Sequence, residues 1–320
     1  MKTTTNIWLT VAAALVLAGG LGFFFIMSAV RWDFSSLSKA KYQTNTIEIS
    51  EKFRNISIKT ETEDITFIPS PDKKCRVEFY EHEKVKPVAS VQDGTLSVSA
   101  KDTRRWYEQI SLFSGAPKIT VYLPQSDYGS LVIEESTGDI SIPGGLTFAE
   151  IGIKVSTGDV DCDASSEGPI RIKTGTGHIH AENISAGELD LSVSTGKIEV
   201  SSADCRGNMN VSVSTGKTML KDAACKDLIS TGSTGDIALE NVTASGTISI
   251  KRSTGDVKFD RCDAGELSVI TDTGDVTGSL RSEKIFIAES DTGRIEVPET
   301  TSGGKCRIST DTGKIIITID

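Results

Sequence analysis

Apolar side chains recur in pairs two residues apart along most of this chain, with polar residues between and after them. From residue 131 onward the pairs return every 19 or 20 residues, and each period carries a Thr-Gly step followed by Asp, Lys, Arg or His. Alternation with a period of two predicts β-strands. A fixed period near 20 predicts a solenoid, in which each coil buries its apolar face only against neighbouring coils.

Ten glycines mark the repeats, and aligning the coils on them produces columns of like residues. Two positions after the glycine, and five and seven positions before it, the residue is mostly Ile, Leu or Val. Two such strands per coil predict two parallel sheets that face each other across a thin core. The expected fold is therefore all-β, a single-stranded β-solenoid (parallel β-helix) of about ten coils over residues 131–320. The ten glycines are Gly138, Gly158, Gly177, Gly196, Gly216, Gly235, Gly255, Gly274, Gly293 and Gly313.

The segment 45–130 alternates in the same way but lacks the repeat. The phrase from Ile56 to Phe67 resembles a coil in which the Thr-Gly turn is replaced by Thr-Glu, and Asp93-Gly94 between two alternating runs predicts a hairpin. An open sheet end must be covered, because uncovered strands pair edge to edge with other chains. We therefore expect this segment to form an irregular, β-rich N-terminal cap.

A long apolar run begins near the N-terminus. Residues 7–30 carry no charge, and at about 1.5 Å per residue a helix of this length spans a hydrocarbon layer of roughly 30 Å. The sequence predicts a short flank (1–6), a transmembrane helix acting as a signal anchor (7–30) and a polar linker (31–44). A cleaved signal peptide is the alternative. Basic residues lie on both sides of the run, so we place the body outside the cytoplasm because this plan is common among single-pass cell-membrane proteins.

Charge and cysteine spacing exclude several classes of protein. The net charge is −10, with 44 acidic and 34 basic residues, which disfavours binding to nucleic acid or to an anionic membrane surface. The six cysteines form no CxxC or CxxH pair, which argues against zinc-finger and thioredoxin-like sites. We expect no cofactor.

Two columns of polar residues flank the glycines, one directly before and one directly after them. The threonine before each glycine has the same odd offset as the inward positions. We therefore expect these threonines to pack inside or at the bend, rather than to form an ice-binding surface. The residue after each glycine should point outward and is often acidic, as at Asp236, Asp256 and Asp275. This strip suits either a weakly held divalent cation or a solvated edge of mixed charge.

Histidines and aspartates coincide on two neighbouring coils. His178 and His180 occupy the same offsets as Asp159 and Asp161 on the preceding coil. Two imidazoles and two carboxylates at that separation form a candidate transition-metal site. A solvated surface is the alternative, because nothing in the sequence supplies an enclosing loop or groups that would orient the ligands.

Two cysteines also occupy equivalent positions on neighbouring coils. Cys205 and Cys225 both lie nine residues after their glycines, so stacking brings their Cα atoms to about 5 Å, within the range of a disulfide. We expect this cross-link if the body is exported to an oxidising compartment.

The alternation of apolar and polar residues is interrupted between residues 101 and 117. Arg104, Arg105, Trp106, Tyr107 and Phe113 fall in this gap. Exposed aromatic and arginine side chains on a loop favour a recognition surface. Alternatively, these side chains close the apolar end of the cap.

The chain ends inside the last predicted coil, at Lys314 to Asp320. An unpaired terminal strand invites pairing with another chain. We therefore expect weak self-association through the C-terminal edge strand.

An apolar N-terminal run, a cap of short strands and Ser-Thr-Gly-Asp coils together resemble a bacterial family of unknown function, known as the "putative adhesin" or toastrack family. The resemblance covers roughly residues 40–320 and implies a β-solenoid at the cell envelope, with some members associated with envelope-stress sensing. It implies no catalytic residues. The phrases that carry it are those from Glu135 to Ile140, from Val155 to Val160 and from Arg252 to Val257.

The expected function is that of a membrane-anchored bacterial envelope protein whose rigid solenoid is a non-catalytic binding or sensing surface. Its partner would be a protein, a peptide or a cell-wall ligand. A β-helix polysaccharide lyase or hydrolase is the alternative, but such enzymes need carboxylates that converge in a cleft. Coils that differ by one residue in length offer little material for a cleft.

Overall fold

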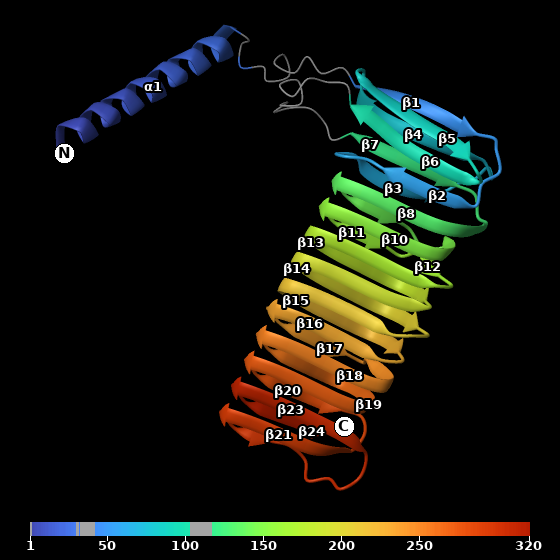
Figure 1. Cartoon of the computed structure of the whole chain (residues 1–320), viewed down its shortest axis with the longest axis vertical. Helices are drawn as coiled ribbons and strands as arrows, with labels where there is room; N and C mark the ends of the chain where they lie inside the picture. Colours follow the sequence, from blue (N-terminus) through green and yellow to red (C-terminus); the bar gives the residue numbers. More distant parts are fainter. Residues whose placement is uncertain (1, 30–31, 33–41, 103–116) are drawn as a thin grey trace.

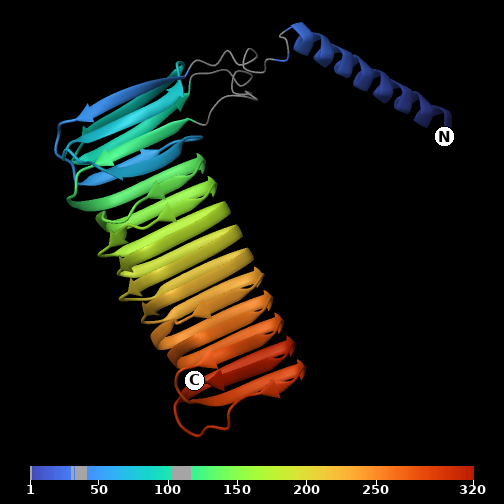
Figure 2. The same ribbon diagram turned by 180° about the vertical axis from the view of Figure 1, so that it is seen from behind.

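The paired apolar positions form strands that stack as the rungs of one long ladder (Figure 1). This computed structural model describes residues 2–29, 32, 42–102 and 117–320. The ladder looks the same from behind, with one coil following another along its axis (Figure 2). The fold is therefore an all-β solenoid, as the period predicted.

The apolar N-terminal run forms helix α1 (Lys2–Ala29). Its stretch Ile7–Ala29 has a mean hydropathy of 2.3, and its described side chains are exposed except that of Met27, which is buried. Trp32 follows the helix and its ring lies edge-on to Phe24, with centroids 5.8 Å apart. A single apolar helix of this length fits either a single-pass membrane anchor or a signal sequence.

Each regular coil contains three extended segments rather than two. In the second coil these are β10 (Thr147–Thr157), β11 (Val160–Cys162) and β12 (Ser165–Ser166). The Thr-Gly turn separates the first segment from the second. A second corner follows six residues after the glycine, where residues such as Asn183 and Asn241 adopt φ near +55°. This third segment was missed because its buried side chains are mostly small, as at Ala186, Ala203 and Ala244, and so stand out less than Ile, Leu or Val.

The remaining solenoid strands run in parallel register, and from Gly138 to Gly274 each Thr-Gly turn stacks on the next. They are β8 (Asp127–Thr137), β9 (Ile140–Ile142), β13 (Pro169–Ala186), β14 (Glu188–Cys205), β15 (Met209–Cys225), β16 (Leu228–Thr234), β17 (Ile237–Glu240), β18 (Thr243–Thr254), β19 (Val257–Thr273), β20 (Val276–Leu280), β21 (Lys284–Thr292), β22 (Ile295–Glu296), β23 (Gly304–Thr312) and β24 (Ile315–Ile319).

The core is a continuous stack of the predicted inward columns. Leu191, Ile198 and Val269 are fully buried, as are their equivalents on most coils. Burial of about 25 cal/mol per Å² of apolar surface is the main force that holds the coils together. Because every coil has the same inward pattern, each can pack against any other coil with little change.

The N-terminal cap stacks in an order that differs from the order of the sequence. Strand β2 lies between β6 and β8, and β3 lies between β7 and β9, so Ile56–Phe67 is the irregular coil that its sequence indicated. Antiparallel strands close the end, with β5 on β6, β4 on β7 and β1 on β4. The Asp93-Gly94 hairpin joins β5 to β6. The cap strands are β1 (Tyr42–Ile49), β2 (Asn55–Lys59), β3 (Asp64–Pro69), β4 (Cys75–His82), β5 (Val85–Gln92), β6 (Thr95–Asp102) and β7 (Lys118–Leu123).

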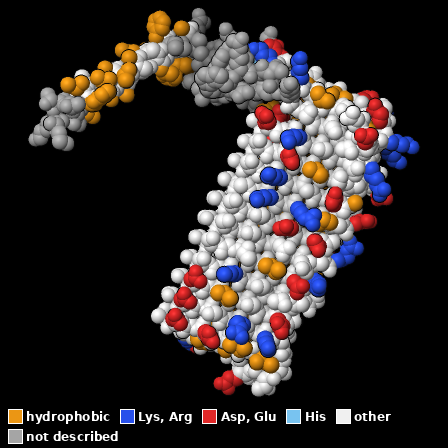
Figure 3. Space-filling model, viewed as in Figure 1, with side chains coloured by type: hydrophobic (Ala, Val, Ile, Leu, Met, Phe, Trp, Pro, Cys, Tyr) orange, Lys and Arg blue, Asp and Glu red, His pale blue; other side chains and the backbone are white. Residues whose placement is uncertain are grey.

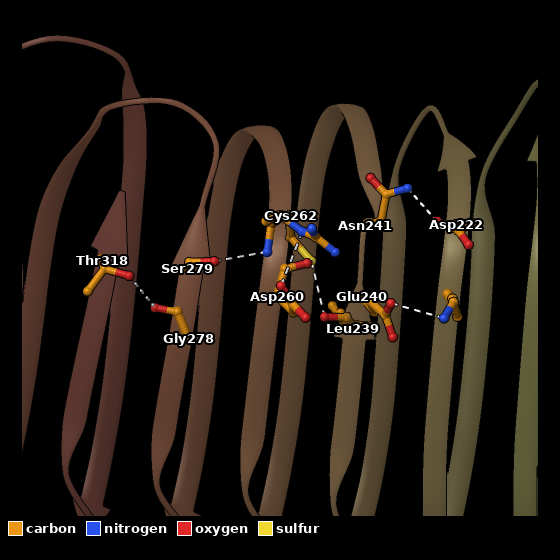
Figure 4. A network of polar contacts seen from close by, with 11 residues as sticks. Asp222, Leu239, Glu240, Asn241, Asp260, Cys262, Gly278, Ser279 and Thr318 are labelled. Atoms are coloured by element: carbon orange, nitrogen blue, oxygen red, sulfur yellow. Dashed lines mark hydrogen bonds and ion pairs between the residues drawn. The ribbon is translucent and has the colours of Figure 1, made fainter. Parts of the chain in front are cut away.

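The prediction of a free C-terminal edge strand was wrong. Strand β24 pairs with β20 on one side and with β22 on the other, and β23 likewise lies between β19 and β21. Figure 4 shows the Thr318 hydroxyl beside the Gly278 carbonyl, at 3.4 Å. The last coil is thus inserted one rung inside the stack, and β21 with β22 forms the terminal rung.

Candidate functional site

A groove of about 570 Å³ lies at one side of the cap, between the segment that joins β1 to β2 and the turn that joins β3 to β4. Ligand sites are commonly concave and of this size. Lysines from both segments reach it, although the chain as a whole is acidic. The lining residues are Glu48, Ile49, Ser50, Glu51, Lys52, Phe53, Lys73, Lys74, Cys75, Pro124, Ser126 and Tyr128.

Stacked aromatic rings support the groove. Phe53 lies on Tyr128 with centroids 6.0 Å apart, and Tyr128 lies on the buried Phe148 at 5.6 Å. The Tyr128 hydroxyl donates a hydrogen bond of 2.7 Å to the Pro124 carbonyl, and burial raises the pKa of this phenol to about 12. Burial likewise raises the pKa of the Cys75 thiol to about 12, so neither group is a nucleophile at neutral pH. Tyr128 and Cys75 therefore support the wall of the groove and do not act as activated nucleophiles.

Three carboxyl groups are buried where the cap meets the solenoid. Glu135 accepts hydrogen bonds from the Thr60 hydroxyl and from the Ser136 and Thr137 amides. Burial raises the pKa of Glu135 to about 7, against these hydrogen bonds, and Glu63 adds to the rise. Burial also raises the pKa of Glu81, which accepts a bond of 2.8 Å from Asn45. The raised pKa of Glu135 predicts that the stability of this junction depends on pH.

A buried arginine interrupts the apolar core farther along. Arg252 replaces an inward residue and donates 3.1 Å hydrogen bonds to the hydroxyls of Thr218 and Ser230. Its guanidinium occupies the space where a side chain at Gly232 would lie. Its Nε and Nη1 have no hydrogen-bond partner among the described residues. On other coils the positions of Thr218 and Ser230 are mostly apolar. Here the two hydroxyls accept hydrogen bonds from Arg252, and Gly232 leaves space for its guanidinium.

The acidic column after the glycines has a structural role. Each aspartate accepts a hydrogen bond from the backbone amide of the equivalent residue on the next rung, over 2.8–3.2 Å. A carboxylate that accepts an amide proton at a tight turn stabilises that turn. The pairs run from Asp64 to Asp139, Asp139 to Asp159, Asp159 to His178, Asp236 to Asp256, Asp256 to Asp275 and Asp275 to Lys314.

The threonine column lies at the bend and not inside, so of the two predicted positions only the inward one was wrong. All ten threonines before the glycines are exposed, and they align along one edge of the solenoid. Strict alternation of every second residue up to the glycine would place the threonine inward. In the structure the last inward residue lies three positions before the glycine, and the two residues after it both face solvent. This ladder is a regular row of hydroxyl groups without a further feature that identifies a ligand.

The predicted metal residues do not form a coordinating cluster. His180 aligns with Asp161, and the His178 ring lies 3.1 Å from an Asp159 oxygen. Burial raises the pKa of Asp161, with a smaller opposing effect of His180. Among the described residues no three His, Cys, Asp or Glu side chains are placed to hold a metal ion. His178 and Asp159 thus form a surface pair, and a metal site remains a prediction from sequence alone.

The two cysteines predicted to pair are free and buried in this structure. They lie on neighbouring strands, in a column whose other members include Ala186 and Ala244. Burial raises the pKa of the Cys225 thiol to about 12. Both thiols therefore act here as small apolar side chains, and the Cys205–Cys225 disulfide stays a prediction for an oxidising compartment.

The predicted recognition residues Arg104, Arg105, Trp106, Tyr107 and Phe113 lie outside the described residues. Sequence reasoning missed the cap groove, because Phe53 and Tyr128 are far apart in the chain and come together only in the fold. A signal was present in the turn that ends with Lys73 and Lys74, where Pro and Asp precede two adjacent basic residues.

Comparison with known proteins identifies a family. A family model described as Toastrack DUF4097 matches residues 53–212 and 205–320. No protein in a search of curated proteins matches the chain.

Several solved structures are similar to the chain. A "putative adhesin" from Bacteroides fragilis NCTC 9343 is 15% identical, with 88% of this chain and 98% of that chain covered and a TM-score of 0.41. A "putative lipid binding protein" from Parabacteroides distasonis ATCC 8503 is 17% identical, with 86% and 97% covered and a TM-score of 0.46. A "putative adhesin" from the same organism is 14% identical, with 88% and 98% covered and a TM-score of 0.45. At these scores no residue role is transferred from them.

Proposed function

The chain belongs to the Toastrack DUF4097 family, and from this premise we propose that it is a membrane-anchored envelope protein whose solenoid is a non-catalytic binding or sensing surface. The observation that carries the proposal is the unbroken stacking of short coils. Between β8 and β24 the longest connection between strands is residues 297–303, so the coils present a continuous, rigid surface. A surface of this kind suits recognition of an extended partner.

The N-terminal helix supports the membrane part of the proposal. A largely exposed apolar stretch of 23 residues has no favourable place in water, because burying it in hydrocarbon is worth several kcal/mol. The body would lie outside the cytoplasm, where the cap groove and the solenoid edges meet envelope components.

The chemistry of the described residues supports a non-catalytic role. The buried thiols have raised pKa values, and the aspartates in the column after the glycines accept hydrogen bonds from backbone amides. A glycosidase or lyase needs two carboxyl groups, or a carboxyl group and a cation, that face a substrate cleft. The cap groove contains Glu48 and Glu51 beside lysines, on an open surface.

Protease accessibility tests the orientation. Intact cells or spheroplasts that express the full chain with a C-terminal epitope are treated with external protease, and a cytoplasmic protein serves as the control. We expect the body to be digested while the control survives, and the chain to stay with membranes after carbonate extraction. Protection of the body under conditions that digest another external protein would overturn the proposal.

Incubation with acidic polysaccharides tests the non-catalytic role. We expect no new reducing ends or unsaturated products. Turnover that survives repurification and is lost on substituting Glu48 and Glu51 with Gln would make the chain an enzyme.

A further inference from the structure

The end of the ladder opposite the N-terminal cap is an open strand edge. Strand β21 pairs with β23 and β22 pairs with β24, and among the described residues neither has a strand on its other side. Both views place this rung at the tip, beyond the C-terminus (Figures 1 and 2). An edge of this kind presents unpaired backbone N–H and C=O groups to a partner.

Side-chain burial shows that a further rung would fit on this edge. Phe286 and Ala288 point inward but are half-buried, whereas Cys306 and Ile308, at the same register on β23, are fully buried. The apolar columns therefore continue to the tip and end uncovered. One more strand that carried apolar side chains at the inward positions would complete their burial.

A buried ion pair and hydrogen bonds at Lys284 hold the terminal rung against the rest of the ladder. The Lys284 ammonium is buried and lies 2.9 Å from an Asp263 carboxylate oxygen. It also contacts the Ser282 hydroxyl, and the Thr300 hydroxyl contacts the Lys284 carbonyl. These contacts connect the rung to β19 and to the loop that follows β22, so the edge does not depend on its backbone pairing alone.

The outward side chains of β21 determine the chemistry of a partner. Ile285 is 41% exposed and Ile287 is half-buried, whereas Glu289 and Asp291 are exposed. Acidic side chains also gather along one side of the lower coils (Figure 3). A partner strand paired with β21 would thus lie beside apolar side chains at Ile285 and Ile287 and beside carboxylates at Glu289 and Asp291.

We propose that the outer edge of β21 binds an extended polypeptide segment of another protein, which adds a strand to the ladder. The segment is apolar opposite Ile285 to Ala288 and carries basic residues opposite Glu289 and Asp291. Backbone hydrogen bonds supply affinity, and alternate side chains supply specificity. This inference rests on the proposed binding role and names the class of partner.

A second copy of the chain fits this edge poorly. If two β21 strands paired antiparallel about Ala288, Glu289 would face Ile287 and Asp291 would face Ile285. Each carboxylate would then lose water against an apolar side chain without gaining a cation, which is unfavourable.

The test measures binding of fluorescent peptides to the full-length chain in detergent micelles by anisotropy. The probe is a nine-residue peptide with valine opposite 285–288 and lysine opposite 289 and 291, and the control peptide carries glutamate in place of lysine. We expect the lysine peptide to bind at least about tenfold more tightly. Equal affinity for the two peptides would overturn the proposal.

Matched variants locate the site. Glu289→Lys with Asp291→Lys should weaken the lysine peptide about tenfold and improve the glutamate peptide. Glu150→Lys with Asp190→Lys changes the net charge equally on exposed positions of the middle coils and should leave both affinities unchanged. Equal effects of the two double variants would overturn the proposal, as would ultracentrifugation that shows a dimer lost in the first variant. Peptide binding in micelles does not depend on how the chain is oriented in the cell. A negative peptide result would therefore reject this inference alone, and a negative protease result would reject the proposed orientation alone.

Discussion

At the scale of single residues, two constraints act together on the glycine of each Thr-Gly corner. Nine of the ten glycines have φ between 126° and 158°, a region that other residues avoid. A side chain at Gly216 would place its Cβ 1.7 Å from the carbonyl oxygen of Gly196 on the adjacent coil. The spacing of the rungs therefore requires glycine at this corner as strictly as the backbone angle does.

Substitution of one glycine tests this account. We expect Gly216→Ala to lower the free energy of unfolding by about 3 kcal/mol or more, because it combines backbone strain with a clash. Gly145 is the control, because its φ is +87° and a methyl group added there would meet no heavy atom within 4 Å. Its change to alanine should cost about 1 kcal/mol. Equal losses in urea unfolding of the full chain would contradict the role of close approach.

The Glu135 carboxyl group predicts a pH dependence with a definite sign. Its folded pKa of about 7 lies above the ordinary value of 4.5, so the folded chain binds more protons between these values. Stability from this group is therefore complete below about pH 4.5 and is lost as the pH rises through 7. Glu135→Gln removes the charge; its amide oxygen can still accept from the Ser136 and Thr137 amides, and its amide nitrogen can donate to the Thr60 hydroxyl. Its stability relative to the natural chain should rise by about 3 kcal/mol between pH 4 and pH 8.

Glu134→Gln is the control for this titration. Glu134 is the adjacent residue, it is exposed, and it pairs with Lys59 over 3.1 Å. The difference from the natural chain should stay within about 0.5 kcal/mol at every pH. Parallel pH profiles for the two variants would show that Glu135 is not the responsible group.

The buried Arg252 predicts a gain in stability on replacement. A guanidinium with two unpaired nitrogens in an apolar core loses its hydration without full compensation. The triple variant Thr218→Val, Ser230→Val, Arg252→Met restores apolar columns, and its free energy of unfolding should rise by about 2 kcal/mol. Arg252→Met alone should gain less, because it leaves two buried hydroxyls without their donor. A loss of stability in the triple variant would show that Arg252 has a stabilising partner.

At the scale of single elements, the ends of a parallel ladder need protection that interior strands do not. The cap uses antiparallel strands and reverses the order of its rungs. The tip instead anchors its last rung through a buried charged residue that points inward, Lys284. Asp263 lies beside it, and hydrogen bonds from Lys284 and Ser282 hold the pKa of Asp263 below its usual value, against the effect of burial.

Lys284→Met should loosen the terminal rung. The variant leaves Asp263 without its cation, which removes a buried ion pair and its hydrogen bonds. We expect amide hydrogen exchange in β21 and β22 to accelerate by about tenfold, which corresponds to about 1.4 kcal/mol. Lys305→Met, at an exposed position on β23, should leave exchange unchanged. Acceleration in both variants alike would point to general loss of charge rather than to the pair.

At the scale of the whole molecule, both ends of the ladder depart from sequential order. One coil is inserted beneath its neighbour at the cap and another at the tip. The coils allow this because they share the same inward columns and the same Thr-Gly register. The connections 281–283 and 297–303 are long enough to step past one rung and return.

Engineered disulfides test the order of rungs at the tip. Ser279 and Thr318 are direct neighbours on β20 and β24, so Ser279→Cys with Thr318→Cys should cross-link under mild oxidation. Thr277 and Glu296 would be neighbours only if the coils stacked in sequence, and Ile316 lies between them here. Thr277→Cys with Glu296→Cys should stay reduced. The opposite pattern on non-reducing gels would show sequential stacking.

The amino-acid sequence by itself determined the repeat, the inward columns, the glycine corners, the irregular first coil and the apolar helix. These follow from local periodicity and from the steric needs of single residues. Tertiary structure alone decided which coils are neighbours at the two ends, and it brought together Phe53 with Tyr128 and Glu135 with Thr60. The physical reason is that near-identical coils are interchangeable in packing energy. Their order depends on connection lengths and end contacts, and no local pattern in the chain encodes those.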